Sequence, residues 1–348
     1  MRIAEIATLL RPVPPDGEGS VESVVSTITE GLVARGHDVT LFALRGSRTA
    51  AELRSPVEAS YTADPEKWDW QLYEAWQVRE AFRSWREFDI LHCHSYHHGL
   101  LVCDYVQTPS LHTIHIDPGP DYVFLARRTR NRHLLFCSRY QARAFEGVDG
   151  VHIVPHGMDM SAYEPAPAGA RGNYLAFLGR FIEEKGPLEA IALARRTGLP
   201  LKLAAPANAY YHEKIEPLVD GRLIEYVGEL GGRRKAEFLA RARALVYPVQ
   251  RGEPFGLVLI EAMASGLPVV ALNRGAVPEV VTHGVTGWLC ETVEEMADAV
   301  ARADALDRRA IRREAVERFA ADRMIDRIEG VMREIVEARR PASAGARS

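Results

Sequence analysis

The chain has 348 residues, of which 47% are hydrophobic and 26% are charged, and its formal net charge at pH 7 is -4. Because this length exceeds the usual size of one hydrophobic core, we expect two domains. The small net charge gives no electrostatic reason to expect nucleic acid as a partner, and it favours small-molecule substrates. The four scattered cysteines form no CxxC pair, which argues against a zinc knuckle or a disulfide framework.

The N-terminus has no pattern typical of a targeting segment. Its sequence MRIAEIATLL is a short apolar run that Arg11 and Pro12 interrupt, too short for the apolar region of a signal peptide. No apolar run approaches the roughly 20 residues that span a bilayer. We therefore expect a cytoplasmic protein without a transmembrane segment, and peripheral membrane contact is left open.

Strand and helix patterns alternate along the first half of the chain. Strands are expected at 2–9, 37–44, 88–94, 109–116, 133–138 and 151–157, with a helix at 21–36 that ends at a glycine. This alternation predicts an α/β domain with a parallel sheet and helices on both faces. We place it at residues 1–165.

A segment rich in Ala, Pro and Gly, from Tyr163 to Asn173, predicts a linker, and after it the alternation begins again. Strands are expected at 174–180, 199–207, 223–230, 244–249 and 267–273, and helices at 187–198, 233–243, 257–266, 277–284 and 309–339. The second doubly wound domain is placed at residues 172–320. A terminal helix, 321–340, is expected to pack back on the first domain.

Ligands bind outside the carboxyl ends of the strands in such sheets, so the loops after the strands are the places to look for a site. In the sequence EPFGLVLIE, Glu253 precedes an expected helix and Glu261 lies four residues after Leu257. Both carboxylates can therefore face the same side of the start of that helix. On this spacing alone the alternative has equal weight: Glu261 would be a solvated helix residue and Glu253 would only interact with the helix dipole.

A second loop, in the sequence FLGRFIEEKG, carries two cations. Arg180 follows the end of an expected strand, and Lys185 precedes a helix that begins at Pro187. Two cations beside the bare N–H groups of a helix N-terminus form an anion site that suits a diphosphate. The alternative is that both are ordinary surface charges, because Glu183 and Glu184 lie between them.

A third loop, DGEGS, follows the first strand. Its glycines, Gly17 and Gly19, would let backbone N–H groups approach an anion or sugar hydroxyls. The dinucleotide fingerprint GxGxxG is absent, and a flexible turn is the alternative.

The histidine-rich sequence HCHSYHH, residues 92–98, raises the question of a metal site. Alternation in an extended segment places His92 and His94 on one face, and Asp89 is the acidic residue nearby. We interpret the segment as a polar loop that lines an acceptor site, and we predict no metal site. His112 is expected to pack in the interior.

These motifs, in this order, resemble family 4 of the GT-B glycosyltransferases, the retaining group 1 enzymes. The signature of that family is two glutamates separated by seven residues, which Glu253 and Glu261 match, and GRFIEEKG is a second specific match. The likeness spans nearly the whole chain and includes VPHGMD and RGAVPEVVTHGVTGWL. The first loop departs from the family pattern, in which two adjacent glycines precede a small residue and a glutamate.

The resemblance implies two Rossmann-like domains that face a central cleft, with the acceptor in the first domain and the nucleotide sugar in the second. Arg180 and Lys185 would hold the diphosphate, Glu261 the ribose hydroxyls and Glu253 the donor sugar, and His115 would lie near the anomeric carbon. The implied catalytic residues are Glu253, His115, Arg180 and Lys185. The implied donor-binding residues are Gly17, Gly19, Arg180, Lys185, Val227, Leu230, Glu253, Phe255, Gly256, Leu257 and Glu261.

The implied reaction is retaining transfer of a sugar from a nucleoside diphosphate sugar, with UDP favoured, to an acceptor hydroxyl. No cofactor is expected, and the sequence has no DxD pair of the kind that binds a diphosphate through magnesium. The partners would be the small-molecule donor and acceptor. Two alternatives are a sugar-nucleotide epimerase or hydrolase of the same fold and a non-catalytic nucleotide-sugar-binding protein.

Overall fold

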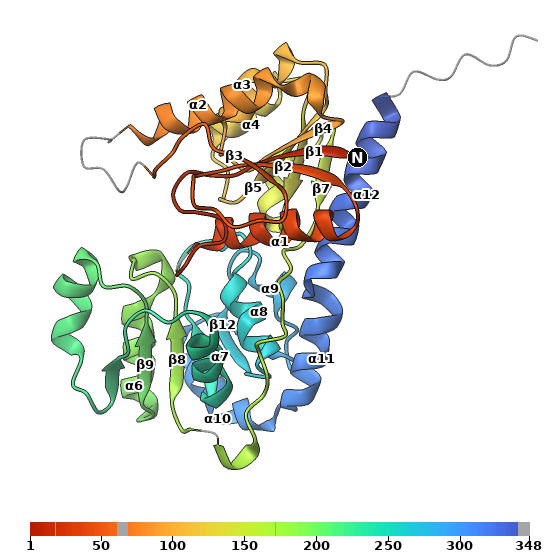
Figure 1. The fold of residues 1–348 in the computed structure, drawn as a ribbon. Coiled ribbons are helices and arrows are strands. Elements are labelled where there is room, and N and C mark those ends of the chain that lie inside the picture. Colours follow the sequence, from red (N-terminus) through yellow and green to blue (C-terminus); the bar gives the residue numbers. More distant parts are fainter. Residues whose placement is uncertain (18, 61–68, 171, 340–348) are drawn as a thin grey trace, which may run out of the picture. The chain divides into compact units, whose positions relative to one another are not determined.

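The structure, a computed structural model, describes residues 1–17, 19–60, 69–170 and 172–339. They form two units, each built on a parallel sheet (Figure 1). The N-terminal unit contains Met1–Met158 and the last helix, and the C-terminal unit contains Asp159–Ala320. The chain therefore leaves the first unit a few residues before the expected linker and returns to it after residue 320.

The sheet of the N-terminal unit has the order β3-β2-β1-β4-β5-β6-β7. Its strands are β1 (Arg2–Ile6), β2 (Asp38–Phe42), β3 (Glu52–Arg54), β4 (Ile90–Cys93), β5 (Ser110–Ile114), β6 (His133–Phe136) and β7 (Val151–Ile153). The order reverses between β1 and β4, which pair in parallel with Glu5 opposite His92. In open parallel sheets, ligands bind beside the carboxyl ends of the strands at this reversal.

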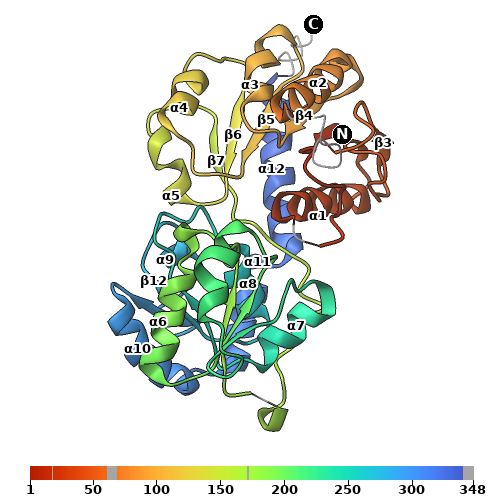
Figure 2. The same ribbon diagram turned by 90° about the vertical axis from the view of Figure 1, so that its left-hand side faces the viewer.

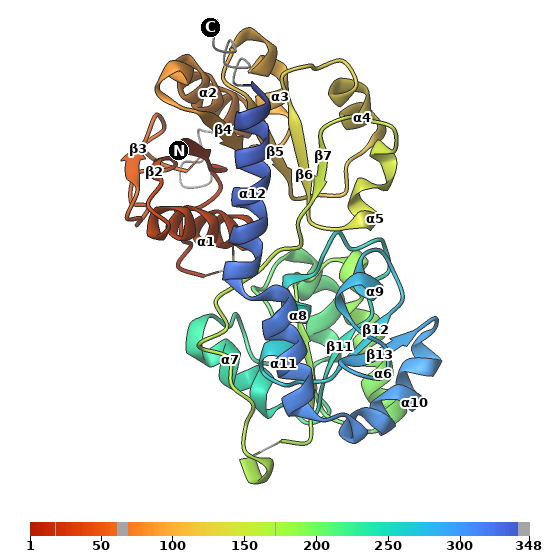
Figure 3. The ribbon, with the colours of Figure 1, turned by 90° about the vertical axis from the view of Figure 1, so that its right-hand side faces the viewer.

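Helices cover both faces of this sheet. They are α1 (Ser20–Ala34), α2 (Trp70–Arg83), α3 (His98–Val102), α4 (Pro120–Ala126), α5 (Arg139–Ala142) and α12 (Ala321–Arg339). Leu41 and Phe42 are neighbours on β2 and point to opposite faces, so Leu41 packs with Val25 of α1 and Phe42 packs with Val78 of α2. Figures 1 and 3 show α12 beside α1, where Arg35 pairs with Asp326 of α12 at 2.7 Å.

The sheet of the C-terminal unit has the order β10-β9-β8-β11-β12-β13 and reverses between β8 and β11. Its strands are β8 (Leu175–Leu178), β9 (Leu201–Ala204), β10 (Ile224–Tyr226), β11 (Ala244–Tyr247), β12 (Val269–Leu272) and β13 (Gly287–Cys290). Its helices are α6 (Pro187–Thr197), α7 (Gly232–Arg241), α8 (Leu257–Ala264), α9 (Val277–Val280), α10 (Val293–Arg302) and α11 (Arg308–Phe319). Within this unit α6 packs with α10, while α8 packs with α7 and α11 (Figure 2).

The predicted pair of doubly wound parallel sheets is confirmed. The short strands β3 and β13 and the helix α10 were not predicted, and no bounds were predicted for the helices α2, α3, α4 and α5. The expected helix at 309–339 is two helices, because Ala320 has an extended backbone with ψ 146 and separates α11 from α12. Among the residues described, no helix combines the length and apolar character that crossing a membrane requires.

Histidines are concentrated in the N-terminal unit. Burial lowers the pKa of nine of its histidines, and for His92 and His112 the pKa falls to about 3. The unfolded chain protonates its histidines near pH 6.5 while the folded unit keeps these rings neutral, so acid favours unfolding. Glu74 acts in the opposite direction, because burial raises its pKa to about 7.

We therefore expect the N-terminal unit to lose stability as the pH falls below about 6.5, by up to about 1.4 kcal/mol per pH unit for each such histidine. The C-terminal unit contains two histidines, His212 and His283. Hydrogen exchange followed at pH 7, 6 and 5 and corrected for intrinsic rates should show protection falling first in the N-terminal unit. An equal loss in both units would contradict this expectation.

Candidate active site

Three side chains meet beside the carboxyl ends of β8 and β11, where the strand order of the C-terminal unit reverses. The Nζ of Lys185 donates to the Oε2 of Glu253, and the hydroxyl of Tyr247 donates to the same oxygen at 2.5 Å. Burial, and next the charge of Glu253, raises the pKa of Tyr247 well above its ordinary value, so this phenol stays protonated. The Oε1 of Glu253 has no partner among the described residues and is available to a ligand.

The backbone of Glu253 is held by the loop that follows β12. The amide of Ala276 donates to the carbonyl of Glu253 at 2.8 Å. Gly275 has φ +62, and a Cβ atom there would overlap the backbone nitrogen and oxygen of Glu253. Only glycine fits this position without moving Glu253, because the clash is with backbone rather than with a flexible side chain.

Arg180 lies in the loop that follows β8 and has an exposed side chain. No described side chain accepts from its guanidinium, whose charge acts to lower the pKa of Tyr247. Lys185 is in the same loop, immediately before the start of α6, and its side chain is 20% exposed. The loop thus offers two cations and the first amide groups of a helix to an anion.

Glu261 lies in the second turn of α8 with its side chain 14% exposed. Its Oε1 accepts from the Nζ of Lys235 at 2.5 Å and from the hydroxyl of Tyr163 at 3.2 Å. The Oε2 has no partner among the residues that the structure describes. Glu261 therefore combines fixed geometry with free lone pairs, a combination that suits vicinal hydroxyls.

The remaining donor residues differ in how much of them a ligand could reach. The amide of Val227 donates to the carbonyl of Leu203 at 3.0 Å. This N–H is therefore already used beside the sheet and is not available to donate to a nucleotide base. The ring of Phe255 is buried against Phe319, which leaves its backbone as the part that could contact a sugar. Gly256, Leu257 and Leu230 are partly exposed, and the first two begin α8.

In the N-terminal unit, Gly17 is exposed in the loop that follows β1. Gly19 caps α1 and lies against Pro15, and a Cβ atom on Gly19 would come within 2.7 Å of that ring. The buried Glu22, in the first turn of α1, accepts from the hydroxyl of Thr8 at 2.8 Å. Gly19 and Glu22 therefore pack against the segment that follows β1.

His115 follows β5 and is partly exposed. Its Nε2 lies 2.9 Å from the Nδ1 of His94, and its ring stacks on that of His156 with centroids 5.6 Å apart. Burial, and next the neighbouring His94, lowers the pKa of His115 well below its ordinary value. A neutral ring at this position can accept or donate a hydrogen bond at its other nitrogen.

The interpretation of residues 92–98 as a polar loop is wrong for His92, His94 and His98, which are buried. His92 lies on the interior strand β4 and is 0% exposed, and His94, directly after that strand, is 2% exposed. Their acidic partner is Glu5 of β1, whereas Asp89 pairs with Arg2 at 2.9 Å. His112 is buried, and its Nε2 lies 2.7 Å from the hydroxyl of Ser110.

The Glu5 cluster is also the place where the described residues bring metal-ligand types together. Glu5, His92 and His94 have their ligand atoms within 4.8 Å of one another. The Nδ1 of His92 and the Nε2 of His94 lie 2.9 Å and 3.0 Å from the two oxygens of Glu5. Hydrogen bonds therefore account for this grouping without a metal ion.

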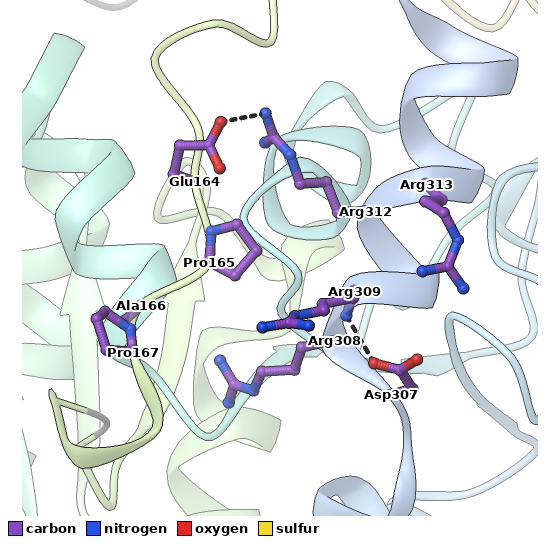
Figure 4. A pocket seen from close by; sticks show the side chains of 9 residues that line it. All are labelled: Glu164, Pro165, Ala166, Pro167, Asp307, Arg308, Arg309, Arg312 and Arg313. Atoms are coloured by element: carbon purple, nitrogen blue, oxygen red, sulfur yellow. Dashed lines mark hydrogen bonds and ion pairs between the residues drawn. The ribbon is translucent and has the colours of Figure 1, made fainter.

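A cavity of about 650 Å³ lies in the C-terminal unit. Figure 4 shows its lining residues, which come from the linker and the start of α11. The cavity contains none of the predicted site residues. Arg308 donates to the carbonyls of Ala240 and Ala242, and Arg312 donates to Glu164 at 2.6 Å. Arg312 therefore ties the linker to α11, and Arg308 ties the start of α11 to the end of α7.

Four residues of these sites were not predicted from the sequence: Glu5, Tyr163, Lys235 and Tyr247. Glu5 had a usable pattern, since a lone carboxylate inside the apolar strand RIAEI requires a buried partner. The other three are common surface or core types whose role depends on contacts between distant loops.

Two family models match successive parts of the chain. The model described as Glycosyltransferase Family 4 matches residues 21–162, and the model described as Glycosyl transferases group 1 matches residues 165–321. The chain is 28% identical to phosphatidyl-myo-inositol mannosyltransferase of Mycobacterium leprae, over 88% of this chain and 86% of that protein. It is 26% identical to glycogen synthase of Mycobacterium tuberculosis, over 84% of each chain.

Solved structures agree with the family models. A glycosyltransferase involved in avilamycin A biosynthesis superposes with a TM-score of 0.71 and 26% identity, over 97% of this chain and 98% of that one. Sucrose-phosphate synthase from Thermosynechococcus elongatus has the same fold, with a TM-score of 0.78 and 21% identity over 97% and 100% of the two chains. The chain therefore belongs to the group 1 glycosyltransferases of the GT-B fold.

Proposed function

We propose that this glycosyltransferase moves a sugar from a nucleoside diphosphate sugar to an acceptor hydroxyl with retention of configuration and without a divalent metal ion. The observation that carries the proposal is the Lys185–Glu253 pair, with Arg180 in the same loop as Lys185, at the strand reversal of the C-terminal unit. Ligands of open α/β sheets bind at this reversal, and cations beside a helix start suit a diphosphate.

In this proposal the C-terminal unit binds the donor. Arg180 and Lys185 neutralise the diphosphate as negative charge develops on the leaving oxygen, so no metal ion is needed for that role. Glu261 accepts from the ribose hydroxyls through its free oxygen, and Glu253 accepts from a hydroxyl of the donor sugar through Oε1. Lys185 thus connects the two ends of the donor, because it also holds Glu253.

For the chemical step we propose departure and attack on the same face of the donor sugar. The bond from the anomeric carbon to the phosphate oxygen breaks, the acceptor oxygen bonds to the same carbon, and the leaving phosphate takes the acceptor proton. The N-terminal unit would supply the acceptor site together with His115. Analysis of the anomeric configuration of the product tests this step, and an inverted linkage would contradict it.

UDP is the nucleotide that we propose for the donor, and GDP is the first alternative. A protein of the same fold has been crystallised with UDP and glucose, and a relative that is 30% identical over 53% of the chain is GDP-mannose-dependent. A thermal-shift screen of UDP, GDP, ADP and dTDP sugars would identify the donor. Release of free sugar at full rate without any acceptor would instead favour an epimerase or hydrolase. Full turnover in the presence of EDTA would support independence from a metal ion.

Removing either cation should weaken nucleotide binding. We expect Arg180→Ala and Lys185→Ala each to cost about 1.5–3 kcal/mol, which is about a 10- to 150-fold rise in Kd, because each loses a charge-assisted hydrogen bond. Calorimetry with UDP and GDP measures this directly. Arg196→Ala, at the opposite end of α6, is the matched control. Unchanged affinity in both variants would contradict the anion site.

A further inference from the structure

A buried carboxylate joins the two strands at the reversal of the N-terminal sheet. Glu5 of β1 is 0% exposed and lies opposite His92 of β4 in the parallel register. Its Oε1 is 2.9 Å from the Nδ1 of His92, and its Oε2 is 3.0 Å from the Nε2 of His94. A buried carboxylate costs several kcal/mol unless it is paired, and these two rings are its partners.

Both rings extend the network away from Glu5. The Nε2 of His92 lies 2.7 Å from the hydroxyl of Thr113 on β5, in the interior of the unit. The Nδ1 of His94 lies 2.9 Å from the Nε2 of His115, which follows the carboxyl end of β5. The network therefore leads from the buried centre of the sheet to the partly exposed residue beside its ligand-binding edge.

The hydrogen bonds restrict where the protons lie. A neutral imidazole has one donor and one acceptor nitrogen, and burial lowers the pKa of His94 to about 4, so this ring is neutral near pH 7. Burial raises the pKa of Glu5, and the hydrogen bond with His94 opposes that shift. When Glu5 is ionised, its Oε2 accepts from the Nε2–H of His94, which leaves the Nδ1 of His94 as an acceptor. His115 must then donate through its own Nε2–H, and its Nδ1 keeps a free lone pair.

We propose that Glu5 is a positioning residue for sugar transfer: through His94 it fixes the tautomer of His115, so that the Nδ1 of His115 accepts a hydrogen bond from a substrate hydroxyl. The inference rests on the proposed function for the identity of that hydroxyl, which belongs to the donor sugar or to the acceptor. The nitrogen that carries the proton in a histidine is set by the hydrogen bond that the other nitrogen makes.

The test is the nitrogen NMR spectrum of the histidine side chains in the intact protein. In the wild-type protein we expect His115 to be protonated on Nε2 and unprotonated on Nδ1. A proton on the Nδ1 of His115, or a divalent ion found by elemental analysis and bound by Glu5, His92 and His94, would overturn the proposal. This spectrum needs no substrate, so a protein that transfers no sugar would count against the proposed function alone.

Variants separate orientation from folding. Leucine suits a strand that is buried on both faces, so Glu5→Leu should fold, lose the single tautomer of His115 and lower kcat about tenfold, as loss of an orienting partner does. Glu5→Gln should restore both, because its amide can accept from His94 and donate to His92. Thr113→Val should change the resonances of His92 and leave those of His115. An unchanged His115 spectrum and unchanged kcat in Glu5→Leu would overturn the proposal.

Discussion

Replacing Glu253 with glutamine should lower kcat about 10²- to 10³-fold, the loss expected when a preorganised polar contact to the reacting sugar is removed. The free Oε1 of Glu253 is the acceptor that we assign to a hydroxyl of the donor sugar, while its Oε2 is occupied by Lys185 and Tyr247. An amide keeps the size of the side chain and can still accept from Tyr247. Calorimetry should therefore show that the Kd for the nucleoside diphosphate changes by less than about threefold, because uniform binding is retained.

Glu261→Gln is the matched variant for this experiment. It lies in the same helix-start region, and Lys235 holds its Oε1, but we assign its free oxygen to the ribose. It should raise the Kd for the nucleotide about tenfold, the loss of one hydrogen bond to a charged group, with a smaller change in kcat. A Glu253→Gln enzyme with kcat within about threefold of the wild type, or the opposite division of effects between the two variants, would contradict the assignment.

Most of the fold could be predicted because each long element carries its own pattern. A helix such as α1 has helical spacing over 15 residues, and the buried parallel strands read as apolar runs between turns. The two strands that were missed have too little sequence to show a period: β3 spans Glu52–Arg54, and β13 is Gly287–Cys290 with one glycine and one tryptophan. Their identity as strands depends on pairing with β2 and β12.

The site residues that lie in loops after strands could be predicted from the sequence. Arg180, Lys185 and Glu253 lie in loops that follow β8 and β11, and the order of strands brings those two ends together. The sequence could not show which side chains donate hydrogen bonds to Glu253 and Glu261. Tyr247 ends an ordinary apolar strand, and Lys235 is one cation in a charged helix, so their bonds to the two glutamates depend on tertiary contacts that no local pattern encodes.

Gly275→Ala should destabilise the C-terminal unit more than any ordinary surface substitution. Its φ of +62 costs an L-residue about 1–2 kcal/mol. The added methyl group also overlaps the backbone of Glu253, and such overpacking costs about 1–3 kcal/mol more. Because the overlap is resolved by moving Glu253, we also expect kcat to fall, which links this glycine to catalysis through position rather than through contact with a substrate.

Gly284→Ala separates the two causes. Gly284 has φ +77, similar to that of Gly275, but nothing lies within 4 Å of the place where its Cβ would stand. The Gly284→Ala variant should be destabilised only by the backbone cost of about 1–2 kcal/mol, and its kcat should stay that of the wild type. Urea unfolding of the two variants, followed by hydrogen exchange in the C-terminal unit, measures the difference. Equal destabilisation and equal kcat in both variants would show that the loop after β12 does not set the position of Glu253.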